Sequence, residues 1–341
     1  MLRSLTICAL AGLALAAAAP ARAQPPAKAL FGAERYPADL ATRSFGSYTR
    51  GCLAGGEMLP VNGPAWQAMR LSRNRFWGHP VLVRYVERLA IDARTRDGWP
   101  GLLVGDMAQP RGGPMDGGHA SHQIGLDADI WLMPMPDRRM TAQEREDVSA
   151  VSVLAPDQLS IDETIWTDAH MRLLRRAASY PEVARIFVHP AVKKKLCETA
   201  GENRAWLSRI RPWWSHHYHF HVRLNCPRGN PDCVEQPAPP PGEGCGQQLE
   251  DWYAMLRRAM KPRKEPEMPR VRPDITMAQM PAQCRAVIEA KDRPPVMAAA
   301  AGEPGLPWLQ GVTRLQSSPA EGVPWPDRKP RRVASPGGAE R

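Results

Sequence analysis

The sequence predicts an α+β fold with a small antiparallel sheet, flanked by helices and by long loops that disulfides hold in place. Two stretches repeat apolar residues at helical spacing, and the candidate strands are short. Helices and strands do not alternate as regular βαβ units, the pattern typical of a doubly wound parallel sheet. We therefore expect an α+β domain.

The elements follow from the local patterns. Residues 80–94 repeat apolar side chains at helical spacing, and a second helix fits residues 167–179. Short strands are expected at residues 101–105, 126–132, 184–188 and 218–224.

The N-terminus has the pattern of a secretory signal peptide. An apolar run rich in Ala and Leu extends to Ala19, and residues 20–23 (Pro-Ala-Arg-Ala) offer a small-x-small cleavage pattern. The run has about 15 residues, fewer than the roughly 20 of a membrane-spanning helix. Cys8 lies inside the run rather than at the cleavage point, so no lipid anchor is expected. We expect residues 1–23 to be removed and the mature protein to be periplasmic, without a membrane span.

The chain is basic, with a formal net charge of +10. Removal of residues 1–23 would take away Arg3 and Arg22 and no acid, so the mature chain stays basic. Excess positive charge favours polyanions, which outside the cytoplasm are anionic lipid and the acidic cell wall rather than nucleic acid. A general solubilising charge explains the same composition, so charge alone assigns no partner.

The cysteines indicate disulfides. An even number in an exported chain favours three disulfides, although six cysteines allow 15 pairings. Their spacings do not match a zinc knuckle. The six that remain after cleavage are Cys52, Cys197, Cys226, Cys233, Cys245 and Cys284.

One large domain is expected over residues 24–289. The Pro-rich stretch 236–244 lies within it and is expected to form a loop, because Cys233 and Cys245 flank it. Beyond residue 289 the chain turns to Pro, Gly, Ala and scattered charge without periodicity. We expect residues 290–341 to be a disordered tail.

Six of the nine histidines fall in two segments, residues 117–131 and 213–224. Because side chains at i and i+2 share one face of a strand, His219 and His221 should emerge together, as should Asp127 and Asp129. Zinc in hydrolases takes three nitrogen or oxygen ligands and keeps a position for water. A lone His-x-His is weak evidence, but a separate histidine seven residues before an aspartate, in a Gly-rich loop, favours a metal site.

Other candidates are weaker. Asp127 is expected to support the site rather than bind metal, and His217 should point away from it. No Gly-x-Ser-x-Gly elbow occurs, and the cysteines are expected in disulfides, so covalent catalysis is disfavoured. The remaining histidines read as structural: His79 and His189 as loop residues before proline, and His170 as part of a helix.

Several longer motifs occur in order between residues 46 and 284. They are Arg-Asn-Arg-Phe-Trp-Gly-His-Pro at 73–80, Gly-Asp-Met at 105–107, Gly-Gly-His-Ala-Ser-His-Gln-Ile-Gly-Leu-Asp-Ala-Asp at 117–129, Arg-Ile-Phe-Val-His-Pro-Ala at 185–191 and the stretch 211–227. With these motifs the sequence resembles the penicillin-insensitive murein endopeptidases. These belong to a wider group of lysostaphin-like, D-alanyl-D-alanine-cleaving and hedgehog-related zinc domains.

The resemblance implies a zinc peptidase acting on peptidoglycan. It implies that His122, Asp129 and His221 bind zinc, with His219 beside the metal as base or transition-state stabiliser and His216 near it. The reaction would be hydrolysis of the D-alanyl to meso-diaminopimelyl cross-link. Because water attacks and no serine is acylated, β-lactams should not inhibit it. The implied disulfides are Cys52–Cys284, Cys197–Cys245 and Cys226–Cys233.

The sequence departs from the family pattern at one point. Some relatives hold a second zinc through the residue matching His119 and an Asp-x-x-His pair. Here the pair aligns with Asp157 and Ser160, so the histidine is missing and a complete second site is not expected. His119 would then orient the zinc ligands or the substrate.

Two other functions fit the same residues. A carboxypeptidase that trims the terminal D-alanine of a stem peptide would use identical chemistry. A non-catalytic, zinc-bearing wall-binding module would keep the fold and the metal. The retained His219 favours an enzyme over such a module, because a binder needs no proton-handling group beside the metal.

Overall fold

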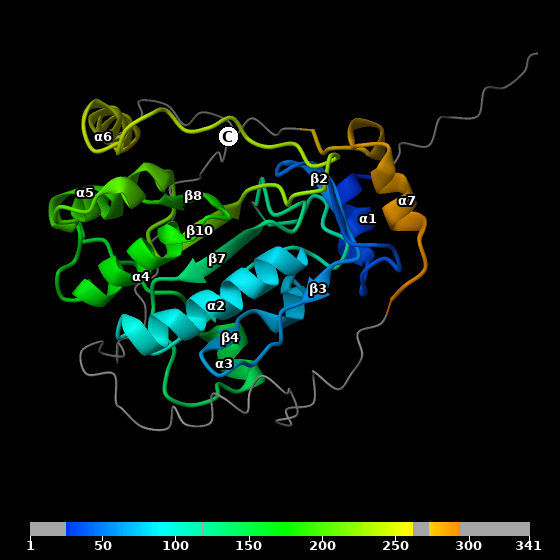
Figure 1. Ribbon diagram of the computed structural model, residues 1–341, viewed down its shortest axis with the longest axis horizontal. Coiled ribbons are helices and arrows are strands. Elements are labelled where there is room, and N and C mark those ends of the chain that lie inside the picture. The colour runs from blue at the N-terminus through cyan, green and yellow to red at the C-terminus, as the bar shows by residue number, and fades with distance from the viewer. Residues whose placement is uncertain (1–24, 118, 262–272, 294–341) are drawn as a thin grey trace, which may run out of the picture.

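The computed structural model describes residues 25–117, 119–261 and 273–293, and it has the α+β architecture expected from the sequence (Figure 1). The expected leader, and residues 294–341 of the expected tail, lie outside the described residues. Among the described residues, no helix combines the length and apolarity needed to cross a membrane.

A six-stranded mixed sheet forms the centre of the fold. Its strand order is β4-β6-β7-β10-β8-β9. The four strands expected from the sequence form its antiparallel middle, whereas the two edge strands pair in parallel, β4 with β6 and β9 with β8. In sheet order the bounds are Trp66–Ala68, Leu102–Val104, Asp127–Trp131, His219–Leu224, Val183–Val188 and Ile210–Pro212.

The two faces of this sheet differ in chemistry. Ala128 and Ile130 of β7, with Phe220 and Val222 of β10, belong to the main apolar core, which also contains the buried faces of α2 (Pro80–Arg96) and α4 (Asp168–Ser179). The alternate residues of β7 and β10 are mostly polar, because successive side chains point to opposite faces. The core face therefore fixes the strands, and the other face is free for chemistry.

The remaining elements surround this sheet. Two two-stranded ribbons pair β1 (Arg43–Ser47) with β2 (Arg50–Ala54) and β3 (Glu57–Met58) with β5 (Trp77–Gly78). Short 3-10 turns are η1 (Leu71–Arg73), η2 (Ala205–Arg209) and η3 (Met277–Gln279). The other helices are α1 (Ala27–Ala33), α3 (Ala142–Asp147), α5 (Pro190–Thr199), α6 (Gln247–Ala259) and α7 (Gln283–Glu289).

His79 and His189 have a definite structural role. Each is the N-cap of a helix with proline in its first turn, and each Nδ1 accepts a hydrogen bond, from Val81 N and Ala191 N respectively, at 3.2 Å. Burial lowers the pKa of His79 to about 4 and that of His189 to about 3, which keeps both rings neutral acceptors. The sequence predicted only that both histidines lie in loops before proline. Their capping role was not predicted, because histidine is not among the usual N-cap residues.

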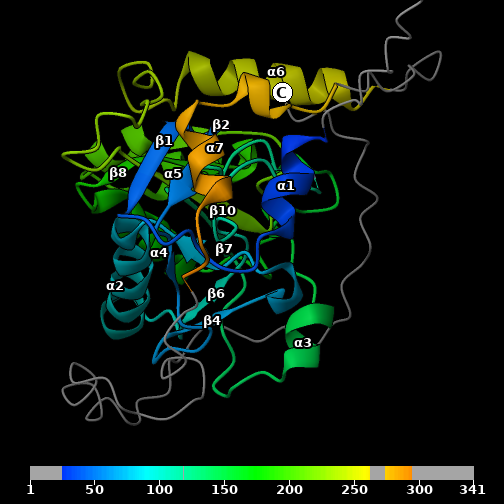
Figure 2. The same cartoon turned by 90° about the vertical axis from the view of Figure 1, so that its right-hand side faces the viewer.

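Disulfides connect distant parts of the chain. They pair Cys52 with Cys284, Cys197 with Cys245 and Cys226 with Cys233, the same pairs that the resemblance implies. The first joins β2 to α7, which lie side by side with α1 nearby (Figure 2). The described chain continues past residue 289, where Arg293 N donates to Pro37 O at 2.9 Å and Asp39 N to Lys291 O at 2.8 Å. The first four residues of the expected tail therefore pack against the N-terminal segment.

Candidate metal centre

The register between β7 and β10 assembles the polar face. Asp129 lies directly opposite His221, and Trp131 lies opposite His219. The i and i+2 spacing places these residues on one face, as the sequence predicts. Pairing between two strands about 90 residues apart therefore creates a cluster of one carboxylate and two imidazoles.

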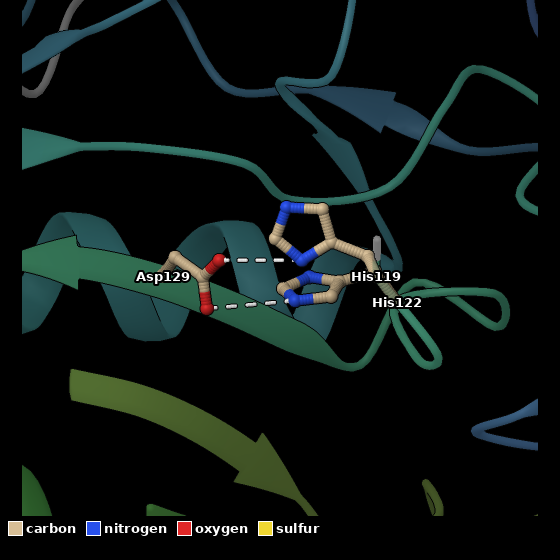
Figure 3. A group of neighbouring side chains, drawn as sticks. All are labelled: His119, His122 and Asp129. Carbon is tan, nitrogen blue, oxygen red and sulfur yellow. Dashed lines mark ion pairs between the residues drawn. The ribbon is translucent and has the colours of Figure 1, made fainter. Parts of the chain in front are cut away.

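A loop before β7 supplies two more histidines, His119 and His122, which both point toward Asp129 (Figure 3). His122 is fully buried and has a φ of 68°, in the left-handed region that residues with a Cβ rarely adopt. Its backbone N–H donates to Asp127 Oδ2 at 3.0 Å, and Gly125 (φ 71°) turns the loop back toward the strand. The loop is thus held in an unusual conformation that aims His122 at the sheet.

Four imidazole nitrogens surround the carboxylate of Asp129. Its Oδ1 lies 3.2 Å from His221 Nδ1, 3.5 Å from His122 Nε2 and 3.6 Å from His219 Nε2. Its Oδ2 lies 3.7 Å from His119 Nδ1. Burial raises the pKa of Asp129, but His219 and His122 outweigh this effect and hold it well below its usual range. The group is therefore a carboxylate among buried nitrogen donors.

Several polar atoms of this cluster lack hydrogen-bond partners. Asp129 Oδ1 and both ring nitrogens of His122 are buried without a hydrogen bond. Burying such atoms unpaired is costly, so native proteins rarely leave them so. A divalent cation would satisfy carboxylate and imidazole lone pairs together, and the nitrogen and oxygen donor set suits zinc. The residues therefore fit a metal ion.

His221 is held on its far side by Asp127. His221 Nε2 lies 3.0 Å from Asp127 Oδ1, and Arg223 contacts both oxygens of Asp127, at 2.7 and 3.2 Å. His221 Nε2 has no hydrogen bond of good geometry, so the nearby negative charge of Asp127 favours the tautomer that carries its proton on Nε2 and leaves the Nδ1 lone pair on the side of Asp129. Asp127 thus supports a histidine instead of facing the metal centre.

His119 is held in the same way by Asp106, for which the sequence predicted no role. His119 Nε2 lies 2.9 Å from Asp106 Oδ2, which also accepts from Arg73 at 3.0 Å and Arg75 at 2.9 Å. Burial raises the pKa of Asp106, but His119 and the two arginines outweigh it and lower the pKa to about 2. Its position in the Gly-Asp-Met motif, just after a strand, was the available signal.

The ligand atoms of His119, His122 and Asp129 all lie within 4.8 Å of one another. This trio contains two of the three zinc ligands expected from the sequence, with His119 in place of His221. The structure also brings His221 against Asp129, so both histidines stay adjacent to the centre.

His219 and His216 pack together beside the cluster. Their ring centroids are 4.9 Å apart, and both side chains are buried. Burial lowers the pKa of His219 to about 4. His217 turns away, with Nδ1 2.9 Å from Ser152 Oγ, and His170 caps α4. Both agree with their expected exclusion from the site.

Asp157 and Ser160 form an exposed turn. The Ser160 hydroxyl donates to the carboxylate of Asp157 at 2.8 and 2.9 Å, and the N–H groups of Leu159 and Ser160 donate to the same carboxylate. The aspartate expected to align with the Asp-x-x-His pair is here engaged in a local turn.

The cluster opens into a cleft of about 300 Å³. His119, Asp129 and His219 line it, and so do Arg70, Arg73 and Trp131. A substrate in this cleft would meet carboxylates, imidazoles and guanidinium groups together.

Comparison with known proteins identifies the class. The family model described as "Penicillin-insensitive murein endopeptidase" matches residues 44–289. Proteins with this name from Klebsiella pneumoniae, Haemophilus influenzae and Escherichia coli are 39%, 42% and 38% identical to the chain. These alignments cover 72%, 73% and 74% of the chain and 86%, 83% and 88% of the relatives. The chain is therefore a peptidase. It belongs to the penicillin-insensitive murein endopeptidase family.

Proposed function

We propose that the protein is a zinc-dependent endopeptidase that hydrolyses the D-alanyl to meso-diaminopimelyl cross-link of peptidoglycan and is insensitive to penicillin. It acts in the periplasm as a domain over residues 24–289, after loss of residues 1–23 and with residues 290–341 as a tail. The observation that carries the proposal is the buried Oδ1 of Asp129, which has three imidazole nitrogens within 3.6 Å and no hydrogen bond.

His122, Asp129 and His221 are the proposed zinc ligands. Two neutral histidines and one carboxylate leave one net positive charge on a bound zinc ion. When bound, zinc supplies Lewis acidity, because it lowers the pKa of water toward roughly 7 and polarises a carbonyl oxygen. His119 orients the centre from its contact with Asp106, and a direct bond from its Nδ1 to the metal is the alternative.

His219 is the proposed proton carrier. Its Nε2 lies 3.6 Å from Asp129 Oδ1 and its side chain lines the cleft. From there the ring takes a proton from the attacking water and returns it to the amine that leaves, the work of a general base and acid. His216 packs against this ring and donates Nδ1–H to Trp214 O, so it positions His219. Since no serine is acylated, penicillin has no nucleophile to react with.

Substitution tests the ligand assignment. Alanine at His122, Asp129 or His221 should abolish zinc content and activity together. His217→Ala is the matched control, because His217 is a partly buried histidine of the same segment that contacts Ser152 outside the site. Full activity in any of the three ligand variants would contradict the assignment.

Digestion of purified, cross-linked peptidoglycan tests the reaction. The mature protein should convert muropeptide dimers to monomers, a chelator should stop it, and penicillin should have no effect. Release of D-alanine from uncross-linked pentapeptide stems, with dimers intact, would instead identify a carboxypeptidase. Unchanged substrates with zinc bound would identify a non-catalytic wall-binding module.

A further inference from the structure

Arg70 places a partly buried guanidinium in the cleft with few partners. Its Nη1 donates to Arg145 O at 3.2 Å, and its Cζ lies 5.7 Å from the centroid of the Trp131 ring. Within the part of the chain that the structure describes, no carboxylate lies at ion-pair distance from Arg70. A guanidinium offers five N–H donors, so most of the binding capacity of this side chain is unused.

The backbone that carries Arg70 is held in place by its surroundings. Arg70 and Asn74, on either side of η1, have φ angles of 55° and 53°, in the left-handed region. Residues with a Cβ adopt this region only at a cost, and such conformations collect at functional sites. Arg70 N donates to Arg145 O at 3.2 Å, and Ser72 binds Glu146 through N and Oγ at 2.8 and 2.9 Å. These contacts fix the backbone at Arg70 and so position its side chain before a substrate binds.

Charged groups of both signs surround Arg70, but the carboxylate that lines the cleft nearest to the arginines is already engaged. Arg73 lines the same cleft and shares the carboxylate of Asp106 with Arg75 and His119. The single carboxylate of Asp106 therefore contacts two guanidinium groups and one imidazole. Burial and nearby Arg73 lower the pKa of Arg70 by more than Glu146, Asp106 and Asp147 raise it, so these carboxylates do not offset the loss of solvation. Guanidinium groups match carboxylates in geometry, since two parallel N–H groups can bind the two oxygens.

We propose that Arg70 binds the substrate carboxylate on the carbon that carries the scissile nitrogen. This inference rests on the proposed function, whose cross-link has a free carboxylate at that carbon of the diaminopimelyl residue. That carboxylate stays at a fixed, short distance from the reacting bond, whereas other acidic groups of the stems are farther away. A cleft of about 300 Å³ that is lined by Arg70, Asp129 and His219 fits this short separation. Arg70 thus determines specificity on the leaving-group side.

The test uses two synthetic cross-linked dimers that differ only at this carbon, one with the carboxylate and one with a carboxamide. Cleavage of both is measured as kcat/KM for the zinc-loaded wild type, Arg70→Gln and the control Arg84→Gln, an exposed arginine on α2. Wild type and control should prefer the carboxylate about 10- to 100-fold, the usual worth of a charge-assisted hydrogen bond. Arg70→Gln should lose this preference by slower cleavage of the carboxylate dimer alone. Arg70→Lys keeps the positive charge but lacks the two parallel N–H donors of a guanidinium, so it should retain an intermediate preference for the carboxylate dimer.

Binding of the same dimers by calorimetry separates this inference from the proposed function. If the wild type cleaves neither dimer, the proposed function fails, and the binding preference decides the role of Arg70. An unchanged preference in Arg70→Gln, or no preference in the wild type, would overturn the inference. Zinc content and thermal stability of each variant show whether it is folded. If Arg70→Gln does not fold, the preference of Arg70→Lys for the carboxylate dimer decides. A reduced preference supports the assignment, and an unchanged preference overturns it.

Discussion

His221 Nε2 lies 3.0 Å from Asp127 Oδ1, while Nδ1 of the same ring lies 3.2 Å from Asp129 Oδ1. One imidazole thus contacts two carboxylates, and the carboxylate on the far side decides which nitrogen carries the proton. Arg223 neutralises the charge of the buried Asp127 carboxylate. Asp127 can therefore hold the Nε2 side of the ring while Nδ1 stays directed at Asp129.

Asp127→Asn should weaken zinc binding about 10- to 100-fold, because the ring of His221 loses the carboxylate that orients it. Chelator competition measures the affinity. The control is Asp97→Asn, since Asp97 is also a buried carboxylate paired with an arginine, Arg176, on other elements. Both variants should lose stability, but only Asp127→Asn should lose zinc affinity. Equal zinc affinities of Asp127→Asn and the wild type would show that Asp127 has no role at the metal.

His219→Ala should keep zinc and lose turnover. General acid–base groups contribute about 10²- to 10⁴-fold to rate, so kcat should fall within that range. Metal analysis and kcat on a cross-linked dimer measure the two effects separately. Loss of zinc from the purified variant would instead make His219 a ligand.

Arg111→Met should destabilise the fold by about 3 to 5 kcal/mol, because several carbonyl groups lose their donor together and each buried one left unpaired costs about 1 to 3 kcal/mol. The guanidinium of Arg111 is buried and donates to Val287 O at 2.6 Å, Ile288 O at 2.7 Å and Asp292 Oδ1 at 2.7 Å. It therefore fastens the end of α7 to the body of the protein. Urea denaturation with disulfides intact measures the loss.

The control for Arg111 is Arg138→Met, because Arg138 forms an exposed ion pair with Glu144. Its denaturation midpoint should stay close to that of the wild type, since exposed pairs contribute little. Similar denaturation midpoints for the wild type, Arg111→Met and Arg138→Met would mean that the contacts of Arg111 do not stabilise the fold.

Lys193 should make stability rise with pH. Its side chain is fully buried and donates to Leu207 O and Glu243 O at 2.8 and 2.6 Å, and burial, with help from Arg211, lowers its pKa from 10.5 to about 7. Between these two values the unfolded chain binds a proton that the folded chain releases, so unfolding becomes less favourable as pH increases. Below pH 7 both states are protonated and the full cost of the buried charge remains.

Urea denaturation at pH 7 and pH 9.5 measures this dependence. From Lys193 alone the wild type should gain about 3 kcal/mol between the two values, and Lys193→Met should lack that gain. Lys194→Met, an exposed lysine of the same helix, should keep it. The assignment fails if Lys193→Met shows the same pH dependence as the wild type.

Local sequence patterns determined much of this protein. Periodicity predicted α2, α4 and the four central strands of the sheet, and the period-two rule placed His219 with His221 and Asp127 with Asp129. These properties depend on residues close together in the chain, whose geometry the backbone repeat sets by itself. The edge strands β4 and β9 were missed because their three residues, Trp-Gln-Ala and Ile-Arg-Pro, lack the apolar run that indicated β6, Leu-Leu-Val.

Tertiary structure decided which groups meet across the fold. Asp127 and Arg223 are 96 positions apart, Arg73 and Asp106 are 33 apart, and nothing in either local pattern specifies the partner. Strand register and loop packing choose these neighbours, because they depend on how the whole core is filled. The sequence by itself thus determined the candidate ligands and their faces, whereas only the folded chain decided which carboxylate holds each histidine and which guanidinium faces the cleft.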